Sequence, residues 1–447
     1  MKANNSIKVL DLFAGAGGLA LGLESVKDER GNPIFEMFRA VEIDKYACET
    51  LRKNFGKDKV IEGDLTKKAI HAKLIEECKG KVSVVAGGIP CQSFSLIGPR
   101  SGFGKKMDKF KEDRRDGLYK EFRRIVKELM PNIVIIENVR GILSKKDSKG
   151  KKIIDLLISD FERLGYNFKN KKDGRKFFTL NAADFGVPQI RERVILVGIK
   201  TSWTKVNVPF VEPTHFNPAE KDAKVLKEKG LLPYVTIADA IGDLPLVNAK
   251  VTYTGLSPEE IKEVKSKNPE IYNGEDQVLF DNEAFHVYLD KMSPSGIEYF
   301  NFVRPNGYAY SHHHVARSQQ ISDLELFDAM KEGETAKEFQ TRMPKLAEKL
   351  IKYGMETFED KYRKQRWHAP CTTVFAHLEK DGNRFIHPRQ KRTLTPREAA
   401  RIQSFPDDFV FCGPYSKKFK QIGNAVPPLL ASRIAETIYE RFKEVLK

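Results

Sequence analysis

The chain has 447 residues, of which 40% are hydrophobic and 31% charged, and this composition excludes a disordered or fibrous protein. Its 77 lysines and arginines outnumber 61 aspartates and glutamates, and the net charge of +16 favours a polyanionic partner such as nucleic acid. Five scattered cysteines without CxxC spacing argue against a disulfide framework and a zinc site. No apolar run is long enough to cross a membrane and no signal peptide is recognisable, so we expect a cytoplasmic protein that binds no metal and no membrane.

The first two hundred residues alternate short, β-branched apolar runs with amphipathic stretches, which is the pattern of repeated strand–helix units. We predict strands at 7–13, 35–44, 60–64, 82–86, 132–137, 177–181 and 194–199, and helices at 18–25, 45–54, 67–78, 117–130 and 153–165. This order predicts an α/β fold with a doubly wound, mainly parallel sheet. Near residue 201 the rhythm stops, and we expect a second, smaller, mostly irregular domain with lysine-rich helical stretches at 219–229, 258–267 and 334–353. Pro427 and Pro428 then open a last helix at 429–446.

Five of the predicted strands end in glycine-rich or polar signals. These signals are the loop Phe13-Ala14-Gly15-Ala16-Gly17-Gly18, the pair Glu42-Ile43, Asp64, the turn Pro90-Cys91 and Glu137. Because the carboxyl ends of parallel strands share one edge of a sheet, we expect all five to converge on one crevice.

The first three signals describe a site for a nucleoside-bearing cofactor. The glycine loop lets a ligand approach the backbone, Glu42 lies where an acid commonly meets ribose hydroxyls, and Asp64 can accept from an adenine amino group. The spacing Gly15-x-Gly17-x-x-Ala20 also fits a loose dinucleotide fingerprint, so a nicotinamide-dependent oxidoreductase is one alternative. A tight strand-to-helix turn without a ligand would explain the glycines alone.

Cys91 and Glu137 indicate the chemistry. They follow neighbouring strands and place a soft nucleophile opposite a carboxyl group. Hydride transfer needs no such pair, whereas addition of a thiolate to an electron-poor ring does. The pair also argues against a non-catalytic DNA-binding protein.

Five sequence motifs, taken together, resemble the ordered motifs of the DNA (cytosine-5)-methyltransferases of bacterial restriction-modification systems. They are Phe13–Gly18, Pro90-Cys91-Gln92, Glu137-Asn138-Val139, Gln189-Ile190-Arg191-Glu192-Arg193 and Gln421-Ile422-Gly423-Asn424-Ala425-Val426. The resemblance implies a methyltransferase fold, S-adenosyl-L-methionine as cofactor, and double-stranded DNA as substrate. It also implies a monomer whose cognate restriction endonuclease is a functional rather than a physical partner. A related enzyme that methylates cytosine in tRNA shares these motifs and remains an alternative.

The same resemblance assigns roles to single residues. Cys91 adds to C6 of a flipped-out cytosine, and Glu137, kept protonated by burial, donates a hydrogen bond at N3. Arg193 reaches the cytosine O2 and Arg191 supports it. Phe13 stacks on adenine, Glu42 binds the ribose and Asp64 the adenine amine. The remaining cofactor contacts are Ala14, Gly15, Gly17, Gly18, Ile43, Pro90, Asn424 and Val426.

The basic stretch 92–115 is a candidate lid that closes over the DNA backbone. Its expected DNA contacts are Gln92, Ser95, Arg100, Lys105 and Lys106. We expect residues 1–200, completed by 420–447, to form the catalytic domain, 201–390 the target-recognition domain, and 391–419 a connecting segment with a supporting helix.

Three features of the later chain are interpreted from their local sequence. Thr395-Pro396-Arg397-Glu398 is a capping box that begins the supporting helix. The segment Arg363-Lys364-Gln365-Arg366-Trp367 fits either a DNA contact or a solvated helix end. The three histidines at 312–314 are interpreted as a polar loop.

Overall fold

The computed structural model describes residues 6–89, 116–147, 150–170, 172–202, 208–249, 257–259, 277–279, 292–304, 310–351, 361–380 and 382–446. The chain divides into two compact units. The first unit comprises Met1–Phe185, Arg191–His215 and Ala425–Lys447, and the second comprises Gly186–Ile190 and Phe216–Asn424. Each unit is described by itself. Within the described residues, no helix has both the length and the apolar character needed to cross a membrane.

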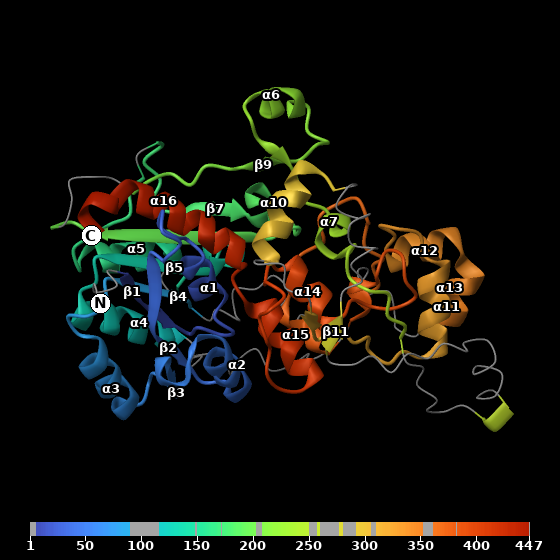
Figure 1. Cartoon of the computed structure of the whole chain (residues 1–447), viewed down its shortest axis with the longest axis horizontal. Helices are drawn as coiled ribbons and strands as arrows, with labels where there is room; N and C mark the ends of the chain where they lie inside the picture. Colours follow the sequence, from blue (N-terminus) through green and yellow to red (C-terminus); the bar gives the residue numbers. More distant parts are fainter. Residues whose placement is uncertain are drawn as a thin grey trace. The chain divides into compact units, whose positions relative to one another are not determined.

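The first unit contains an eight-stranded sheet in the order β3-β2-β1-β4-β5-β8-β6, with β7 paired to β8 (Figure 1). The strands are β1 (Ile7–Leu12), β2 (Phe35–Glu42), β3 (Val60–Glu62), β4 (Val84–Gly88), β5 (Ile133–Val139), β6 (Tyr166–Asn167), β7 (Phe178–Asn181) and β8 (Glu192–Lys200). The five strands β1 to β5 pair in parallel, whereas β8 runs antiparallel to β5, β6 and β7. The predicted α/β fold with a mainly parallel sheet is therefore confirmed.

Apolar helix faces cover both sides of this sheet. The helices are α1 (Gly18–Glu24), α2 (Lys45–Phe55), α3 (Lys68–Cys78), α4 (Asp116–Leu129), α5 (Ile153–Glu162) and α16 (Pro428–Leu446), with 3₁₀ turns η1 (Lys57–Lys59), η4 (Arg140–Leu143) and η5 (Ala182–Phe185). One core joins α3, α4 and α5 to β1, β4 and β5, with Phe122 and Phe161 fully buried in it. A smaller cluster joins Ala20 of α1 and Leu51 of α2 to β2. The sheet is thus doubly wound, as its strand–helix alternation predicts.

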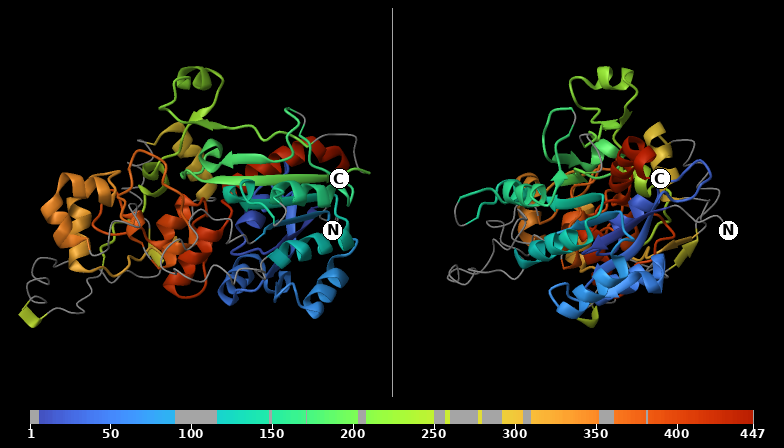
Figure 2. Two further views of the ribbon diagram at one scale, coloured as in Figure 1. Left: turned by 180° about the vertical axis from the view of Figure 1, so that it is seen from behind. Right: turned by 90° about the vertical axis from the view of Figure 1, so that its left-hand side faces the viewer.

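Helix α16, the last helix of the chain, completes the first unit by packing against helix α1 (Figures 1 and 2). Gly22 of α1 lies so close to the backbone of α16 that a Cβ there would collide with the Pro428 carbonyl and with Ala431. The Ser25 hydroxyl donates to the Ser432 hydroxyl at 3.0 Å. Segments more than four hundred residues apart in sequence therefore share one helix–helix contact, which only a residue without a side chain permits.

The second unit is built from short helices and irregular chain. Its elements are α6 (Ala223–Glu228), α7 (Ile237–Ile241), α10 (Pro294–Val303), α11 (Ile321–Ala329), α12 (Ala336–Arg342), α13 (Pro344–Leu350), α14 (Pro396–Ile402), α15 (Tyr415–Asn424), the 3₁₀ turns η7 (Ala376–Glu379) and η8 (Asn383–Phe385), and the strands β10 (Leu232–Pro233), β11 (Gln277–Leu279) and β12 (Tyr310–His312). β9 (His215–Phe216) lies at the boundary of the two units. The single lysine-rich helix predicted at 334–353 is wrong, because α12 ends before Met343 and Pro344 begins a new helix. Most of the stretch 258–267 lies outside the described residues.

Besides an apolar cluster around Phe327 and Phe339, the second unit contains buried charges around α14. The capping box of α14 forms as predicted, with Thr395 accepting from the Glu398 N–H and Glu398 accepting from the Thr395 N–H. Arg397, Glu398 and Arg401 of this helix are all buried. His313 and His314 lie in irregular chain after β12, in line with the interpretation of 312–314 as a polar loop, but they are buried, at 4% and 0% exposed. His314 bonds the Thr395 hydroxyl and the Pro245 carbonyl instead.

Candidate active site

The carboxyl ends of β1 to β5 form one edge of the sheet. Register pairs Leu12 with Val41 and Gly87, Glu42 with Glu62, and Gly88 with Glu137. β1 lies between β2 and β4, so the strand order reverses direction at β1 and β4, and a crevice opens at such a switch point. The signals that follow β1, β2, β3 and β5 therefore lie along one edge, as the parallel pattern predicts.

The loop after β1 adopts a backbone that leaves room for a ligand. Phe13, Gly15 and Gly17 have φ values of 57°, 57° and 87°. This region is open to glycine but strained for a bulky residue such as Phe13, and such strain clusters at functional sites. A Cβ at Gly15 would meet no atom within 4 Å, whereas one at Gly17 would collide with Leu51 and Phe55. Gly15 thus faces open space, and at Gly17 the positive φ favours glycine.

Glu42 connects the ends of β1 and β2. One carboxylate oxygen accepts from the Gly15 N–H at 2.8 Å, and the other accepts from the N–H groups of Ile43 and Asp44 at 2.8 and 2.9 Å. Ile43 beside it is 66% exposed, which offers an apolar surface to a flat ring. An acid, an exposed aliphatic group and an open backbone loop fit a nucleoside.

Asp11 is a residue of this region that the sequence interpretation missed. It lies on β1 between Leu10 and Leu12 and is 1% exposed, and its Oδ2 has no hydrogen-bond partner. Burial and the negative charge of Glu42 raise the pKa of Asp11 to about 8, although the Ala20 backbone N–H opposes the shift. The available signal was an aspartate between two leucines in a strand.

Asp64 follows β3 and organises the turn there. Its Oδ1 accepts from the Thr66 N–H at 2.9 Å and from the Thr66 hydroxyl at 2.8 Å. These bonds form an Asx turn, which accounts for an aspartate at this position. Recognition of an adenine amine by Asp64 stays a prediction.

Glu137 and Arg193 form an ion pair at the end of β5. Arg193 Nε lies 2.8 Å from Glu137 Oε1, and the two side chains are only 11% and 12% exposed. Glu137 is paired in register with Gly88, where a Cβ would lie 3.0 Å from Glu137 Oε2. Burial lowers the pKa of Arg193, and the charge and hydrogen bond of Glu137 oppose that shift. The pair fixes the position of the carboxyl group, while the expectation of a protonated Glu137 stays a prediction.

Arg191 lies beneath this pair. It is 1% exposed, and its Nη2 donates to the Ala425 carbonyl at 3.0 Å. Burial lowers the pKa of Arg191 well below its usual value, the charge of Arg193 adds to the shift, and the charge of Glu137 opposes it. Arg191 therefore ties the start of β8 to the segment that contains Val426, which is 7% exposed.

Several predicted site residues lie outside the described residues. They are Pro90, Cys91, Gln92, Ser95, Arg100, Lys105 and Lys106. Asn424 belongs to the second unit, at the end of α15, and is exposed. The first unit brings together Phe13, Ala14, Gly15, Glu42, Ile43, Glu137, Arg191 and Arg193 along the strand edge. No cluster of three or more His, Cys, Asp or Glu suited to a metal ion occurs among the residues that the structure describes.

Comparisons with known proteins agree with this geometry. The family model of the C-5 cytosine-specific DNA methylases matches residues 7–440. The Type II methyltransferase M1.HphI of Haemophilus parahaemolyticus is 32% identical over 97% of this chain and 87% of its own length. The Type II methyltransferase M.AgeI of Thalassovita gelatinovora is also 32% identical, over 97% and 99% of the two chains. A solved structure of an Escherichia coli prophage protein, assigned as a DNA modification methyltransferase, shares the fold with a TM-score of 0.64 and 22% identity, covering 98% of this chain and all of that one.

Proposed function

Since the chain belongs to the C-5 cytosine-specific DNA methylase family, we propose that it methylates C5 of one cytosine within a specific duplex sequence, with Cys91 as the nucleophile and S-adenosyl-L-methionine as the methyl donor. The observation that carries this proposal is the buried Glu137–Arg193 ion pair beside Gly88, since the chain leaves β4 there toward Pro90 and Cys91. An oxidoreductase would leave this pair and the excess positive charge without a role.

The residues of the first unit fit S-adenosyl-L-methionine. The open space above Gly15, the carboxylate of Glu42 and the exposed Ile43 suit a backbone-contacted chain, a ribose and an adenine. We assign Phe13 and Ile43 to the adenine faces, Glu42 to the ribose hydroxyls and Asp64 to the adenine amine. Ala14, Gly15, Gly17, Gly18, Pro90, Asn424 and Val426 complete the assignment. When bound, this cofactor supplies an electrophilic methyl group.

The chemical step follows from the reactivity of cytosine. Its C5 is a weak nucleophile, and addition of the Cys91 thiolate to C6 moves the electron pair of the 5,6 double bond onto C5. C5 then takes the methyl group, a base removes the proton at C5, and the Cys91–C6 bond breaks to restore the ring. Glu137 donates a hydrogen bond at N3, and Arg193 holds O2 while it orients Glu137. Preorganised groups of this kind lower the barrier without moving during the reaction.

A cytosine inside a duplex cannot reach Cys91, so the base must be flipped out. We assign the basic stretch 92–115 to holding the displaced backbone, with Gln92, Ser95, Arg100, Lys105 and Lys106 as contacts. Replacing Lys105 and Lys106 by alanine should weaken DNA binding and reduce its salt dependence by about two charges. An unchanged slope of log Kd against log salt would refute this assignment.

The second unit is proposed to carry the target-recognition domain, at residues 201–390, and the relatives named type II methyltransferases support a restriction-modification role. In that role the enzyme is a cytoplasmic monomer that protects host DNA from a cognate endonuclease, without a stable complex between the two. S-adenosyl-L-methionine must be captured by the first unit while the second reads the duplex.

Mapping methylated cytosines on plasmid DNA from cells that express the chain tests the activity. We expect 5-methylcytosine at one repeated sequence context, and methylation of tRNA but not of DNA would overturn the proposal. Cys91→Ser should keep binding DNA and cofactor, yet form no covalent adduct with duplex DNA that contains 5-fluorocytosine. An adduct that persists in Cys91→Ser would exclude Cys91 as the nucleophile.

A further inference from the structure

An arginine is stacked on a tryptophan at the surface of the second unit. The Arg389 guanidinium carbon lies 4.7 Å from the centre of the Trp367 ring, and the ring of His387 lies 6.0 Å from the same indole. Arg389 is exposed, Trp367 is half-buried and His387 is 2% exposed. The indole ring therefore holds the Arg389 guanidinium at the surface through a cation–π contact.

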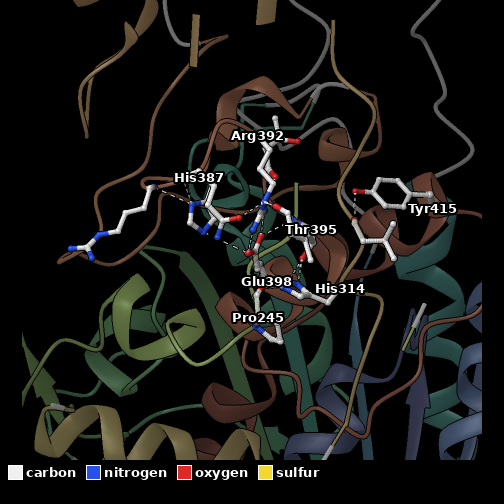
Figure 3. Close-up of polar contacts among 12 residues, drawn as sticks. Pro245, His314, His387, Arg392, Thr395, Glu398 and Tyr415 are labelled. Carbon is white, nitrogen blue, oxygen red and sulfur yellow. Dashed lines mark hydrogen bonds and ion pairs between the residues drawn. The ribbon is translucent and has the colours of Figure 1, made fainter. Parts of the chain in front are cut away.

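The turn that presents Arg389 is anchored on a buried ion pair (Figure 3). His387 Nδ1 accepts from the N–H groups of Arg389 and Gln390, each at 3.0 Å. The Arg392 guanidinium donates two hydrogen bonds to the Glu398 carboxylate, of 2.7 and 2.6 Å, and both side chains are buried. Burial lowers the pKa of His387 to about 3, so the ring is neutral and Nδ1 can accept. Arg389 is thus carried by a rigid turn rather than by a free loop.

The segment that contains Trp367 is also held in place by backbone and side-chain contacts. Residues 361–367 are not the end of a helix, since Arg363 pairs with Thr335 and Lys364 with Ile386 as isolated bridges. The backbone N–H of Trp367 donates to the Glu332 carboxylate. The Lys364 ammonium donates to the Phe327 and Met330 carbonyls at the end of α11. Lys364 is therefore not available for DNA.

Two exposed arginines, Arg366 and Arg389, lie at Trp367, and the Glu332 carboxylate accepts from the backbone N–H of the same tryptophan. Arg366, exposed next to Trp367, lies against Gly333, whose φ of 83° and missing Cβ make room for it. Among the residues that the structure describes, no acid pairs with the guanidinium of Arg366 or Arg389. Arg366 and Arg389 are thus two exposed arginines without an ion-pair partner, next to an aromatic ring. Such a surface is suited to bind a polyanion.

We propose that Arg389, held on Trp367, is a specificity-determining residue that contacts a base edge of the target DNA, and that Arg366 beside it contacts a phosphate. A guanidinium fork matches the O6 and N7 atoms of guanine, and a fork held in one orientation can discriminate between bases. A flexible, solvated arginine would serve a phosphate equally well, so the rigid turn is the observation that favours base reading. This inference rests on the proposed function, because it assumes that the second unit meets DNA.

The test uses the full chain and the sequence context that plasmid mapping identifies. Methyl-transfer kcat/KM is measured on the cognate duplex and on duplexes with each base pair substituted singly. Arg389→Ala should reduce the preference for one G·C pair by about 5- to 150-fold and leave the preference at other positions unchanged. Arg389→Lys keeps the positive charge but lacks the planar guanidinium fork, so it should lose the same preference while the chain stays folded.

Lys349→Ala is the matched control, because it removes one exposed charge from α13 of the same unit and should leave every preference unchanged. A variant Arg389→Ala with wild-type preferences overturns the inference. The inference is also overturned if Arg389→Ala lowers kcat/KM equally on all duplexes and Arg389→Lys restores it. That result assigns Arg389 to a phosphate contact. If the wild-type chain methylates no cytosine, the proposed function itself is refuted. That result differs from an active Arg389→Ala variant with wild-type preferences, which refutes only the role of Arg389.

Discussion

Replacing Asp11 by asparagine should remove a pH dependence from the stability of the first unit. The ordinary pKa of an aspartate is 3.8, and burial together with Glu42 raises that of Asp11 to about 8 in the folded chain. Between these values the folded state holds one proton more than the unfolded state. The free energy of unfolding must therefore fall as the pH rises.

The size of the effect follows from the linkage relation. One proton of difference changes the free energy of unfolding by about 1.4 kcal/mol per pH unit. From pH 5 to pH 7 the loss is therefore about 3 kcal/mol. The contribution is fully present below pH 3.8 and disappears as the pH rises through about 8. An asparagine at position 11 cannot ionise, so this variant lacks the slope.

Urea denaturation followed by circular dichroism at pH 5, 6 and 7 measures the difference between wild type and Asp11→Asn. The quantity of interest is how that difference changes with pH, because the fit of the amide contributes equally at each pH. Asp155→Asn on α5, where the aspartate is exposed, is the control and should show no such change. Parallel pH profiles for wild type and Asp11→Asn would refute the argument that Asp11 is buried as a neutral acid.

Three further substitutions test the site and the fold. Glu42→Ala removes an acceptor of three backbone N–H groups and should weaken binding of S-adenosyl-L-methionine about 10- to 100-fold by calorimetry, with Glu42→Gln intermediate. Arg193→Ala leaves Glu137 without its ion-pair partner and should lower the single-turnover rate at least about 100-fold; a parallel loss of cofactor affinity would indicate a folding defect instead. Glu398→Gln leaves the buried charge of Arg392 without an anionic partner. It should destabilise the chain by about 3–5 kcal/mol in thermal denaturation. A loss of stability below about 1 kcal/mol would contradict this.

The local pattern of the sequence was sufficient for the sheet of the first unit. β-Branched runs such as Val84–Gly88 and Ile133–Val139 are buried on both faces, and such runs form strands with few alternatives. The capping box at Thr395 needed only four consecutive residues. Pro344 marks the break between α12 and α13 because a proline cannot continue a helix, although the lysine-rich pattern runs on across it.

The candidate site was predictable where it follows from strand ends. Glu42 is the last residue of β2 and Glu137 is the last residue of β5 that pairs with β4, and parallel pairing alone brings such positions to one edge. The partner of Glu137 was not predictable in this way, because β8 is antiparallel to β5 and its position depends on how the chain returns. The burial of His313 and His314 was not predictable for a related reason. The partners of His314, the Thr395 hydroxyl and the Pro245 carbonyl, come from distant parts of the chain.

Sequence by itself determined the class of fold and the family, since each of these depends on short stretches of contiguous chain. Tertiary structure alone decided which charges are paired and buried. The contacts of Glu137 with Arg193, of Arg191 with Ala425 and of α1 with α16 each join segments far apart in the chain. The stability of a buried charge depends on the partner that packing brings to it and on the solvent that packing excludes, and neither quantity is encoded in a local pattern.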